Sequence, residues 1–450
     1  MAWGKPDGTT PAAAASELVS KASATGSVVV MPFRKFGDVE CAALCELLAT
    51  NATVTELKAS GHKLGVDGAL AVGKMLGNPK CGLRHLAVGH SEFGSEGLQA
   101  LVDGLNHAGC PLETLDLGFK GLCASDGDLL CTLLTGCSSL RTCVLCRNVQ
   151  LGAAGVGALF ESPTGVRPAF GSSLTTLDLS ETGIDAATLS LIGRAAATDV
   201  IGLRSLDLSQ NPGVGGSSEC SGAAIAKLMA SLHSLKLRGC GLTSSDGSVL
   251  GSALMLSPAA ELKEVFLDDN PLLFERTASG ESQASYELIE GLALCPSLNI
   301  LTMGDCAVTD AVAKAIGDCC QSYAHFTDLD LRSNRLSAVG FADVLRLPKL
   351  LRLSVFNNPQ LGSASMWPLA LACHLQTLDL GACQLTAASI KSLSDVLCSG
   401  DGAELRCLEL FGNGDMDSRE VWRAELARLR EARPGLDIAW KEPAGDQTAE

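Results

Sequence analysis

The sequence predicts an α/β solenoid, in which the short strands of one parallel sheet alternate with helices that cover its outer side. Three observations predict it: a strand-like motif recurs along the chain, its copies follow one another at a nearly constant interval, and the residues between them show helical periodicity. A chain of 450 residues is too long for one ordinary core. A repeat array escapes that limit because each layer contacts only its neighbours.

The strand-like motif has apolar residues at its first, fourth and sixth positions, and in most copies Asn, Cys, Thr or Ser at its ninth. Two plain examples are LTTLDLSETGI, which begins at Leu174, and LQTLDLGACQL, which begins at Leu375. Most successive copies start 28 to 30 residues apart, a length that accommodates a strand, a turn, a helix and a second turn. The thirteen copies begin at Val54, Leu83, Leu112, Leu140, Leu174, Leu203, Leu232, Leu262, Leu298, Phe326, Leu350, Leu375 and Leu405.

Helices are expected between the strands of most repeats. The segments SEGLQALVDGLN after Phe93, AATLSLIGRAAA after Ile184 and AASIKSLSDVL after Leu385 place apolar residues at intervals of three and four. Each helix therefore has one side to bury against its own strand. Stacked repeats would form a horseshoe with the parallel sheet on the concave side and the helices on the convex side.

Two further features concern the residues around the strands. Cysteines stand two or three residues before the first Leu of several copies, as in CPLETLDL at Cys110 and CPSLNIL at Cys295. At the turn position, Asn and Cys alternate through Asn211, Cys240 and Asn270. With the motif itself, these features resemble the ribonuclease-inhibitor-like family of leucine-rich-repeat proteins over roughly residues 25 to 440. The resemblance implies the horseshoe fold and says little about a ligand.

The ends of the array are predicted to be closed by caps, because a terminal repeat would otherwise expose apolar surface and a strand edge. We expect a flexible segment over residues 1–20, a degenerate repeat as the N-terminal cap over 21–53 and about thirteen repeats over 54–417. A helix-like segment and a strand-like PGLDIAW predict a C-terminal cap over 418–440, and residues 441–450 are expected to be loose.

Composition and charge narrow the function. A net charge of -16 and a pI near 4.9 disfavour a nucleic-acid partner, because binding a polyphosphate depends on Lys and Arg. No signal peptide and no apolar run of membrane-spanning length is found, which predicts a soluble, cytoplasmic protein that does not bind membranes. Several of the nineteen cysteines recur at fixed repeat positions and are interpreted as small buried side chains.

The alternation of side chains along a strand assigns a set of residues to the concave face. Asp178 and Asp207 are expected to be close neighbours there, a like-charge pair that a cationic partner would relieve. Exposed aromatic residues also favour binding, and three of them fall in the C-terminal half with three arginines near them. The predicted partner-binding residues are Asp178, Asp207, Arg238, Phe266, Asp268, Asp330, Arg332, Arg352, Phe356, Asp379, Glu409 and Phe411.

Other interpretations of these residues remain open. The Asp of L-x-x-L-D-L can be a habit of the family that is well solvated and structurally neutral, and one or more of the Phe side chains can be covered by the protein's own loops. Two long insertions, Glu161 to Ser173 and Phe274 to Glu287, are expected to emerge as loops on opposite edges of the array, where either could carry binding.

No catalytic or metal-binding constellation is recognised. The sequence contains no G-x-x-x-x-G-K-[ST], H-E-x-x-H or G-x-S-x-G motif, and GAAGVG at Gly152 is expected to open a repeat helix. The C-x-x-C formed by Cys143 and Cys146 lies in an expected strand, where residues three apart point to opposite faces and cannot chelate one ion. We therefore expect no enzyme activity, no cofactor and no metal.

These observations predict a non-enzymatic scaffold that binds a protein partner on its concave face, alone or as part of a larger cytoskeletal or ciliary assembly. An alternative is a regulator of a small GTPase resembling the Ran GTPase-activating proteins, which share this repeat type. That family carries an acidic tail, whereas KEPAGDQTAE here is only weakly acidic, and none of its catalytic residues is matched. A third alternative, the sensor part of an innate-immune receptor, would require a nucleotide-binding domain upstream of Met1.

Overall fold

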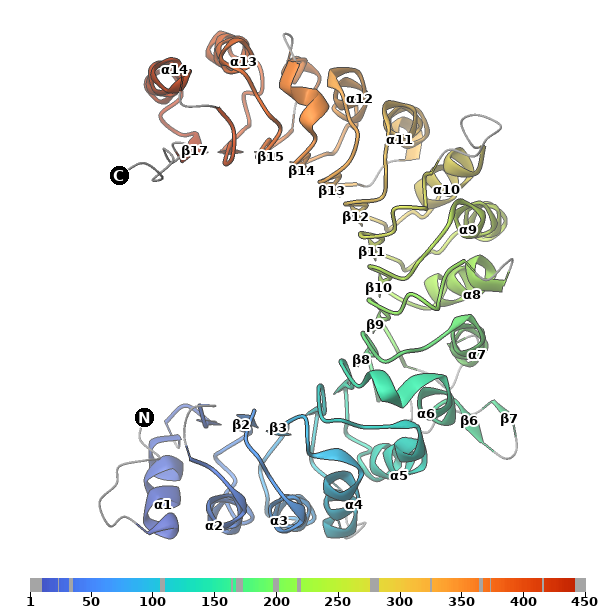
Figure 1. Ribbon diagram of the computed structural model, residues 1–450, viewed down its shortest axis with the longest axis vertical. Helices are drawn as coiled ribbons and strands as arrows, with labels where there is room; N and C mark the ends of the chain where they lie inside the picture. Colours follow the sequence, from blue (N-terminus) through green and yellow to red (C-terminus); the bar gives the residue numbers. More distant parts are fainter. Residues whose placement is uncertain are drawn as a thin grey trace, which may run out of the picture. The chain divides into compact units, whose positions relative to one another are not determined.

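The computed structural model describes residues 10–22, 24–31, 35–105, 110–162, 165–166, 173–196, 202–216, 220–275, 283–323, 326–363, 367–372, 374–414 and 417–441. The internal contacts of the chain define two units, Met1–Val214 and Gly215–Glu450, called unit 1 and unit 2 below. Both are built from parallel strands that alternate along the chain with helices (Figure 1).

In unit 1 the main sheet has the order β1-β2-β3-β4-β5-β8-β9, with each strand parallel to the next. Its strands are β1 (Ser27–Val29), β2 (Glu56–Ser60), β3 (His85–Gly89), β4 (Thr114–Asp116), β5 (Thr142–Val144), β8 (Thr176–Asp178) and β9 (Ser205–Asp207). Its helices are α1 (Pro11–Ala22), α2 (Asp38–Leu48), α3 (Val66–Leu76), α4 (Gly94–Gly104), α5 (Gly127–Gly136), α6 (Gly152–Ala158) and α7 (Ala186–Ala196), with 3-10 turns η1 (Ala124–Asp126) and η2 (Val149–Leu151).

Unit 2 repeats the pattern, and its strands β10 to β17 are paired in parallel in sequence order. These strands are β10 (Ser234–Lys236), β11 (Glu264–Phe266), β12 (Ile300–Thr302), β13 (Asp328–Asp330), β14 (Arg352–Ser354), β15 (Thr377–Asp379), β16 (Cys407–Glu409) and β17 (Asp437–Ala439). Its helices are α8 (Cys220–Met229), α9 (Ser244–Leu256), α10 (Gln283–Ala293), α11 (Asp310–Tyr323), α12 (Ala338–Val344), α13 (Ala387–Ser399) and α14 (Arg419–Ala432), with 3-10 turns η3 (Pro359–Ser363) and η4 (Leu369–Leu371).

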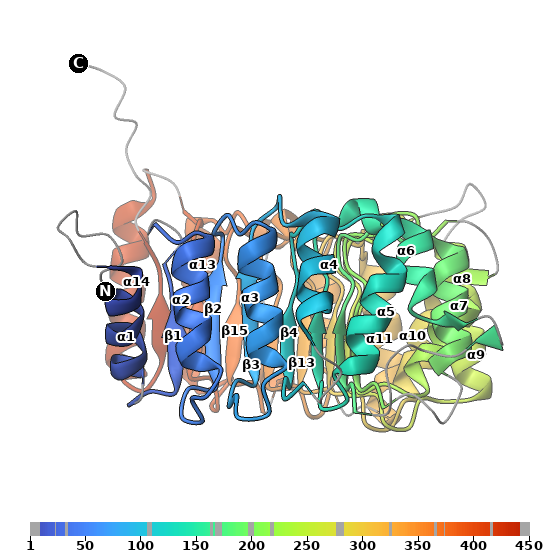
Figure 2. The same cartoon turned by 90° about the horizontal axis from the view of Figure 1, so that it is seen from below.

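The strands show the alternation that the motif predicts. The central residue of each three-residue strand is buried and its two neighbours are in most cases only partly buried, as in β8 and β15. The buried Leu side chains face the helices of their own unit, which cover one face of its sheet (Figures 1 and 2). The opposite face, predicted to be concave, is called the inner face. The predicted α/β leucine-rich-repeat architecture is confirmed.

Buried asparagines stabilise the turns that follow several of the strands. Asn270 Oδ1 accepts hydrogen bonds from the backbone N–H groups of Cys240 and Leu242 in the preceding repeat, at 3.1 and 3.0 Å. Its Nδ2 donates to the carbonyls of Leu237 and Leu267, at 2.9 and 2.6 Å. One side chain thus satisfies buried backbone groups of two repeats, which explains why the sequence keeps Asn here. The same kind of contacts is made by Asn148, Asn211, Asn334, Asn358 and Asn413. These six residues are together called the asparagine ladder.

The cysteine that alternates with Asn acts as a smaller filler. Cys306 Sγ donates to the carbonyl of Leu267 at 3.1 Å, and Cys383 Sγ does the same to Val355. Both side chains are completely buried. This burial confirms the interpretation of the repeat cysteines as small core residues.

The N-terminal segment differs from the prediction. A flexible stretch was expected over residues 1–20, but residues from Pro11 onward form helix α1, which packs against α2 and buries Ala15 and Ala22. The segment PAAAASELVSKA consists mainly of strong helix formers and begins with Pro, which is favoured at the first helical position. The prediction gave too much weight to Ala-rich composition. Residues 1–9 and 442–450 lie outside the described residues.

The insertions are described only in part. In the first, Glu161–Ser162 (β6) pairs antiparallel with Gly165–Val166 (β7), while residues 163–164 and 167–172 lie outside the described residues. In the second, residues 276–282 lie outside them. Helix α10 begins at Gln283, so the loop predicted to run to Glu287 ends earlier.

Candidate functional site

The twelve predicted binding residues all lie within the described ranges, but they divide between the two units. Asp178 and Asp207 belong to unit 1, and the other ten belong to unit 2. Each unit therefore presents its own part of the predicted surface.

The pair in unit 1 has the predicted geometry. Asp178 and Asp207 are register partners on β8 and β9. Each carboxylate also has a local function, since Asp178 Oδ1 accepts from the N–H of Ser180 and Asp207 Oδ1 from that of Ser209, both at 2.9 Å. These bonds satisfy a backbone donor just beyond the strand.

The same bond recurs wherever this motif position is Asp. Asp116, Asp330 and Asp379 each accept from the backbone N–H two residues later, at 2.8 to 2.9 Å. The Asp of L-x-x-L-D-L therefore has a structural function, which differs from the alternative interpretation that it is structurally neutral. The second carboxylate oxygen of each Asp is not needed for this bond, so a structural function leaves it available for other contacts.

Asp268 is the residue whose place in the structure differs most from the prediction. Its side chain is only 2% exposed, so it is not an open binding position. Arg332 Nη2 lies 3.4 Å from Oδ1 and Arg238 Nε lies 3.5 Å from Oδ2, while Gly304 N–H and Thr302 Oγ1 donate to the same carboxylate. Asp268 is buried because the two arginines cover it, and it positions them on the inner face.

The three predicted aromatic residues do not form a single patch. Phe266 lies on β11, with Lys236 Nζ 5.9 Å from its ring centroid, whereas Phe356 follows β14 and Phe411 follows β16. The strands β12 and β13 separate Phe266 from the other two. Arg352 pairs with Asp328, and among the described residues it makes no cation–π contact with a ring.

Phe356 and Phe411 flank a glycine. The backbone pairing of β14, β15 and β16 continues past the strands, because Asn357 N–H donates to Gly381 O at 2.8 Å and Ala382 N–H donates to Phe411 O at 2.6 Å. A β-carbon added to Gly381 would lie 2.7 Å from Cδ2 of Phe356, so this ring lies over the glycine. Phe356 is 37% exposed and Phe411 is 45% exposed. Phe356, Gly381 and Phe411 together are called the phenylalanine platform.

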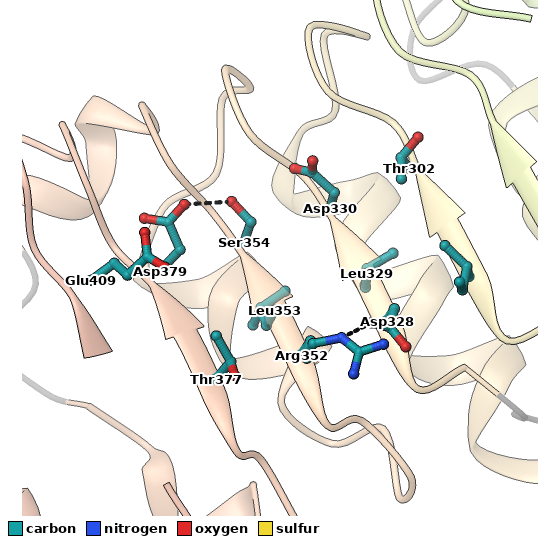
Figure 3. A pocket seen from close by; sticks show the side chains of 11 residues that line it. Thr302, Asp328, Leu329, Asp330, Arg352, Leu353, Ser354, Thr377, Asp379 and Glu409 are labelled. Atoms are coloured by element: carbon teal, nitrogen blue, oxygen red, sulfur yellow. Dashed lines mark hydrogen bonds and ion pairs between the residues drawn. The ribbon is translucent and has the colours of Figure 1, made fainter. Parts of the chain in front are cut away.

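A hollow of about 300 Å³ lies beside the platform on the inner face of unit 2 (Figure 3). Its lining comes from β12 to β16 and includes the carboxylates of Asp328, Asp330, Asp379 and Glu409. Figure 3 shows Ser354 and Asp379 pointing toward one another, joined by a hydrogen bond of 2.9 Å, with Glu409 next to Asp379. In the described part of the chain, the side-chain carboxylate of Glu409 has no hydrogen bond or ion pair, and Asp379 has no cationic partner.

Nearby carboxylates contribute to the raised pKa values of two groups in and beside the hollow, Asp330 and Cys407. Burial raises the pKa of Asp330 above its ordinary value, and the carboxylates of Asp268 and Asp379 raise it further, although Arg332 opposes the shift. The pKa of the Cys407 thiol is likewise raised, first by burial and then by Glu409 and Asp437. Burial is the larger cause of both shifts, and the neighbouring carboxylates add to it.

Sequence reasoning missed two contributors to this surface and one buried lysine in unit 1. Gly381 makes room for Phe356, and Ser354 orients Asp379, but neither carries a charge or a ring that marks it in the sequence. In unit 1, Lys120 takes the place of the ladder asparagine and is only 3% exposed, with Nζ donating to Gly118 O at 2.7 Å. The sequence did contain a signal for it, because Lys120 is the ninth residue of a motif copy, a position that is Asn, Cys, Thr or Ser in most copies.

The cysteines and the other titratable groups give no sign of a metal centre. The described residues contain no group of three or more His, Cys, Asp or Glu suited to an ion. Cys143 is fully buried and Cys146 is partly exposed on the inner face, the arrangement that the strand prediction required. Burial raises the pKa of Cys143 to about 12 and that of Cys146 to about 11, so neither thiol is activated. No helix in the described ranges combines the length and apolar content needed to cross a bilayer.

Comparison with known proteins agrees with this architecture. The family profile described as "Leucine Rich repeat" matches residues 81–102 and 372–394. The ribonuclease inhibitor of Sus scrofa is 27% identical over 336 residues, which cover 68% of this chain and 70% of the inhibitor. The ribonuclease inhibitor of Mus musculus is 26% identical over 267 residues, covering 59% and 55%.

One further sequence relative and two solved structures cover different shares of this chain. NACHT, LRR and PYD domains-containing protein 12 of Homo sapiens is 26% identical over 433 residues, which are 88% of this chain and 34% of that protein. The solved TLR13–ssRNA13 complex matches with a TM-score of 0.44 and 16% identity, over 81% of this chain and 46% of that one. The leucine-rich repeat-containing protein LegL7 of Legionella pneumophila has a TM-score of 0.39 and 18% identity, over 66% and 92%. Both TM-scores are too low to support an argument.

The repeat motif, the parallel strands with their covering helices and the asparagine ladder define a leucine-rich-repeat protein. Among these proteins, the chain is similar to the ribonuclease inhibitors of Sus scrofa and Mus musculus. Leucine-rich-repeat proteins generally act in protein–protein interaction.

Proposed function

We propose that this chain is a non-catalytic scaffold that binds a protein partner through the inner face of unit 2. The observation that carries the proposal is the phenylalanine platform, whose two rings stay 37% and 45% exposed although the face around them is polar. Exposed rings on a rigid surface gain free energy when a partner covers them, and aromatic anchors are frequent among binding hot spots.

The rigidity of the face supports the same proposal. The carboxylates and arginines around the platform are held by strand pairing and by bonds such as those of Asp268 and Asp379. A partner would therefore meet side chains that are already ordered, and binding would cost little conformational entropy on this side. The acidic composition favours a basic or neutral protein over nucleic acid as the partner.

The proposal includes a cytoplasmic location, alone or within a larger assembly. It is supported by the sixteen cysteines whose side chains are described, all of which are free thiols, a state that a reducing compartment maintains. Cell fractionation with the tagged full chain checks it, and recovery in a secreted fraction contradicts it.

Affinity capture from native cell extract tests the binding proposal. The bait is the intact chain, beside a variant with Phe266, Phe356 and Phe411 all changed to Ala and a control with Phe119→Ala. Phe119 is 57% exposed on unit 1, so the control removes an exposed ring of the same kind elsewhere. A protein captured by the intact chain and the control, and lost with the triple variant, is expected. Equal capture by all three baits would move the contact to another surface.

A further inference from the structure

The phenylalanine platform and the adjacent carboxylates together select a particular kind of side chain. We infer that this part of unit 2 recognises an arginine presented by an extended segment of a partner protein, with its guanidinium stacked on the platform and hydrogen-bonded to Asp379 and Glu409. The inference rests on the proposed function, because it names the chemistry of that contact.

The first step is the geometry of the platform. Phe356, Gly381 and Phe411 occupy neighbouring positions on three adjacent strands, as the backbone bonds at Gly381 O and Phe411 O require. With strands about 4.8 Å apart, the two Phe positions are separated by about 10 Å. Because Gly381 has no side chain, Phe356 lies over it and the surface between the two Phe positions is low, with Asp379 Oδ1 at its border, 3.1 Å from where a β-carbon of residue 381 would lie. A flat group fits such a surface better than a bulky branched one.

The second step is the position of the negative charge. Asp379 and Glu409 precede Gly381 and Phe411 by two residues on their strands, and their side chains therefore lie on the same face. Asp379 Oδ1 accepts from Gly381 N–H at 2.9 Å, so this carboxylate borders the platform. A guanidinium over the rings can donate its outer N–H groups to a carboxylate placed there.

The third step is the absence of an internal cation. The arginines near the hollow already have partners, since Arg332 pairs with Asp330 and Asp268, and Arg352 pairs with Asp328. Asp379 is bonded to Ser354 Oγ and Gly381 N–H but to no cation among the described residues. The carboxylate of Glu409 has no hydrogen-bond or ion-pair partner among the described residues. Two carboxylates on adjacent strands thus remain without a counter-charge, which is the electrostatic complement of a cationic ligand.

Arginine fits this combination better than lysine. Its guanidinium is planar, stacks on aromatic faces, is weakly hydrated and donates several N–H groups in one plane to carboxylates. A lysine ammonium satisfies the charge but gains less from the rings and loses more hydration. From the usual strength of such cation–π contacts, we expect arginine to bind about five-fold to thirty-fold more tightly than lysine.

The test uses three fluorescent peptides that are identical except at one position in a flexible Gly-Ser sequence, which is Arg, Lys or citrulline. Binding to the full chain is measured by fluorescence anisotropy at physiological ionic strength, which screens the general attraction of a chain with net charge -16. The expected order is Arg first, Lys clearly weaker and citrulline undetectable, because citrulline keeps the shape of arginine but carries no charge.

Two variants separate the rings from the carboxylates. Phe356→Ala with Phe411→Ala is expected to weaken arginine binding about ten-fold and to bring it to the level of lysine. Asp379→Asn with Glu409→Gln is expected to abolish binding of both peptides. The controls are Phe119→Ala for the rings and Asp178→Asn with Asp207→Asn for the charges, since these residues lie in unit 1. Unchanged thermal unfolding of each variant shows that the fold is intact.

Gly381→Ala gives an independent check. It keeps both rings and both carboxylates but moves Phe356, because the added carbon would lie 2.7 Å from the ring, and it crowds Asp379 Oδ1 less closely, at 3.1 Å, so the readout is the ratio of arginine to lysine binding, in which a loss of charge complementarity common to both peptides cancels. Loss of the preference for arginine in this variant supports the platform as the recognition element.

Equal binding of the Arg and Lys peptides to the intact chain, or a preference for Arg that survives loss of both rings, would overturn the inference. Failure here is distinguishable from failure of the proposed function. If capture of a protein from extract depends on Phe356 and Phe411 but no arginine preference is measured, the scaffold function stands and the arginine chemistry is wrong. If capture is independent of the rings, the proposed contact surface itself is wrong.

Discussion

Arg332, which follows β13, lies over Gly304 and reaches across β12 to Asp268, which follows β11, with 3.4 Å between Nη2 and the buried Oδ1. Arg238 approaches the other oxygen of the same carboxylate from the opposite side. The two arginines are 36% and 41% exposed, whereas Asp268 is almost completely covered. The inner face of unit 2 is therefore organised around a carboxylate that a partner cannot reach directly.

Removing the charge of Asp268 should cost more stability than removing a neighbouring surface charge. In Asp268→Asn, the bond from Gly304 N–H can persist but both arginines lose their counter-charge, and we expect a loss of about 1.5 to 3 kcal/mol. The measurement is the free energy of unfolding in urea. Asp269→Asn is the matched control, since Asp269 is 42% exposed and has positive φ, which Asn tolerates. Equal losses in the two variants would contradict a buried organising function.

The asparagine ladder makes a second prediction. Asn270→Ala removes an acceptor for the N–H groups of Cys240 and Leu242 and donors for two buried carbonyls, and no water can replace them without opening the turn. Because each unsatisfied buried group costs about 1 to 3 kcal/mol, we expect a loss of about 2 to 4 kcal/mol after relaxation. Urea unfolding measures it. Gln99→Ala, at an exposed helical position, should change little, and a small effect of Asn270→Ala would show that the ladder is dispensable.

Asp330 gives a pH-dependent prediction. Burial raises its pKa above the ordinary 3.8, so the folded chain binds a proton that the unfolded chain has already released. The contribution of Asp330 to stability is therefore favourable at low pH and is lost as pH rises through the interval from 3.8 to the raised value. In Asp330→Asn this loss should disappear, and at neutral pH the variant should be as stable as the wild type or more so.

The measurement for Asp330 is the difference in unfolding free energy between variant and wild type across the acidic range. Asp305→Asn is the control, since Asp305 is exposed and outside the hollow. A difference that is constant with pH would show that the proton affinity of Asp330 is the same in the folded and unfolded states.

The repeat architecture could be predicted from sequence because it depends on a local pattern that recurs. Each copy of the motif repeats the same three buried apolar positions, and the strands are accordingly found at positions such as Leu177 and Leu378. The assignment of Asp178 and Asp207 to adjacent places on one face followed from strand alternation alone and is confirmed.

The site was predictable only in part, because strand alternation shows which residues share a face of the sheet but not which of their side chains contact one another. Asp268 was assigned to the exposed face but is buried, since Arg238 from the preceding repeat and Arg332 from two repeats further on cover it. Phe266 was grouped with Phe356 and Phe411 although strands β12 and β13 separate them. Helix α1 was missed because the Ala-rich composition of its segment was taken as a sign of flexibility, although its strong helix formers allow a helix that packs against α2.

Lys120 makes the last prediction, because it places an amine where the other repeats have a neutral turn residue. Burial lowers its pKa below the ordinary 10.5, and the nearby Asp116 and Cys146 offset only part of the shift. Below the lowered value the folded protein carries a buried charge at a cost. Between that value and 10.5 the unfolded chain binds a proton that the folded chain does not, so stability should rise with pH in this window.

Replacing Lys120 by Met keeps the length of the side chain but removes the charge, and the rise in stability with pH should disappear. At neutral pH the gain from removing the buried charge is opposed by loss of the bond to Gly118 O, so the variant is best judged by its pH slope. The measurement is the variant minus wild-type unfolding free energy from pH 7 upward, in which titrations common to both chains cancel. Lys74→Met, at an exposed position on α3, should leave the slope unchanged. The same slope in Lys120→Met and the wild type would show that the Lys120 amine is already solvated in the folded protein.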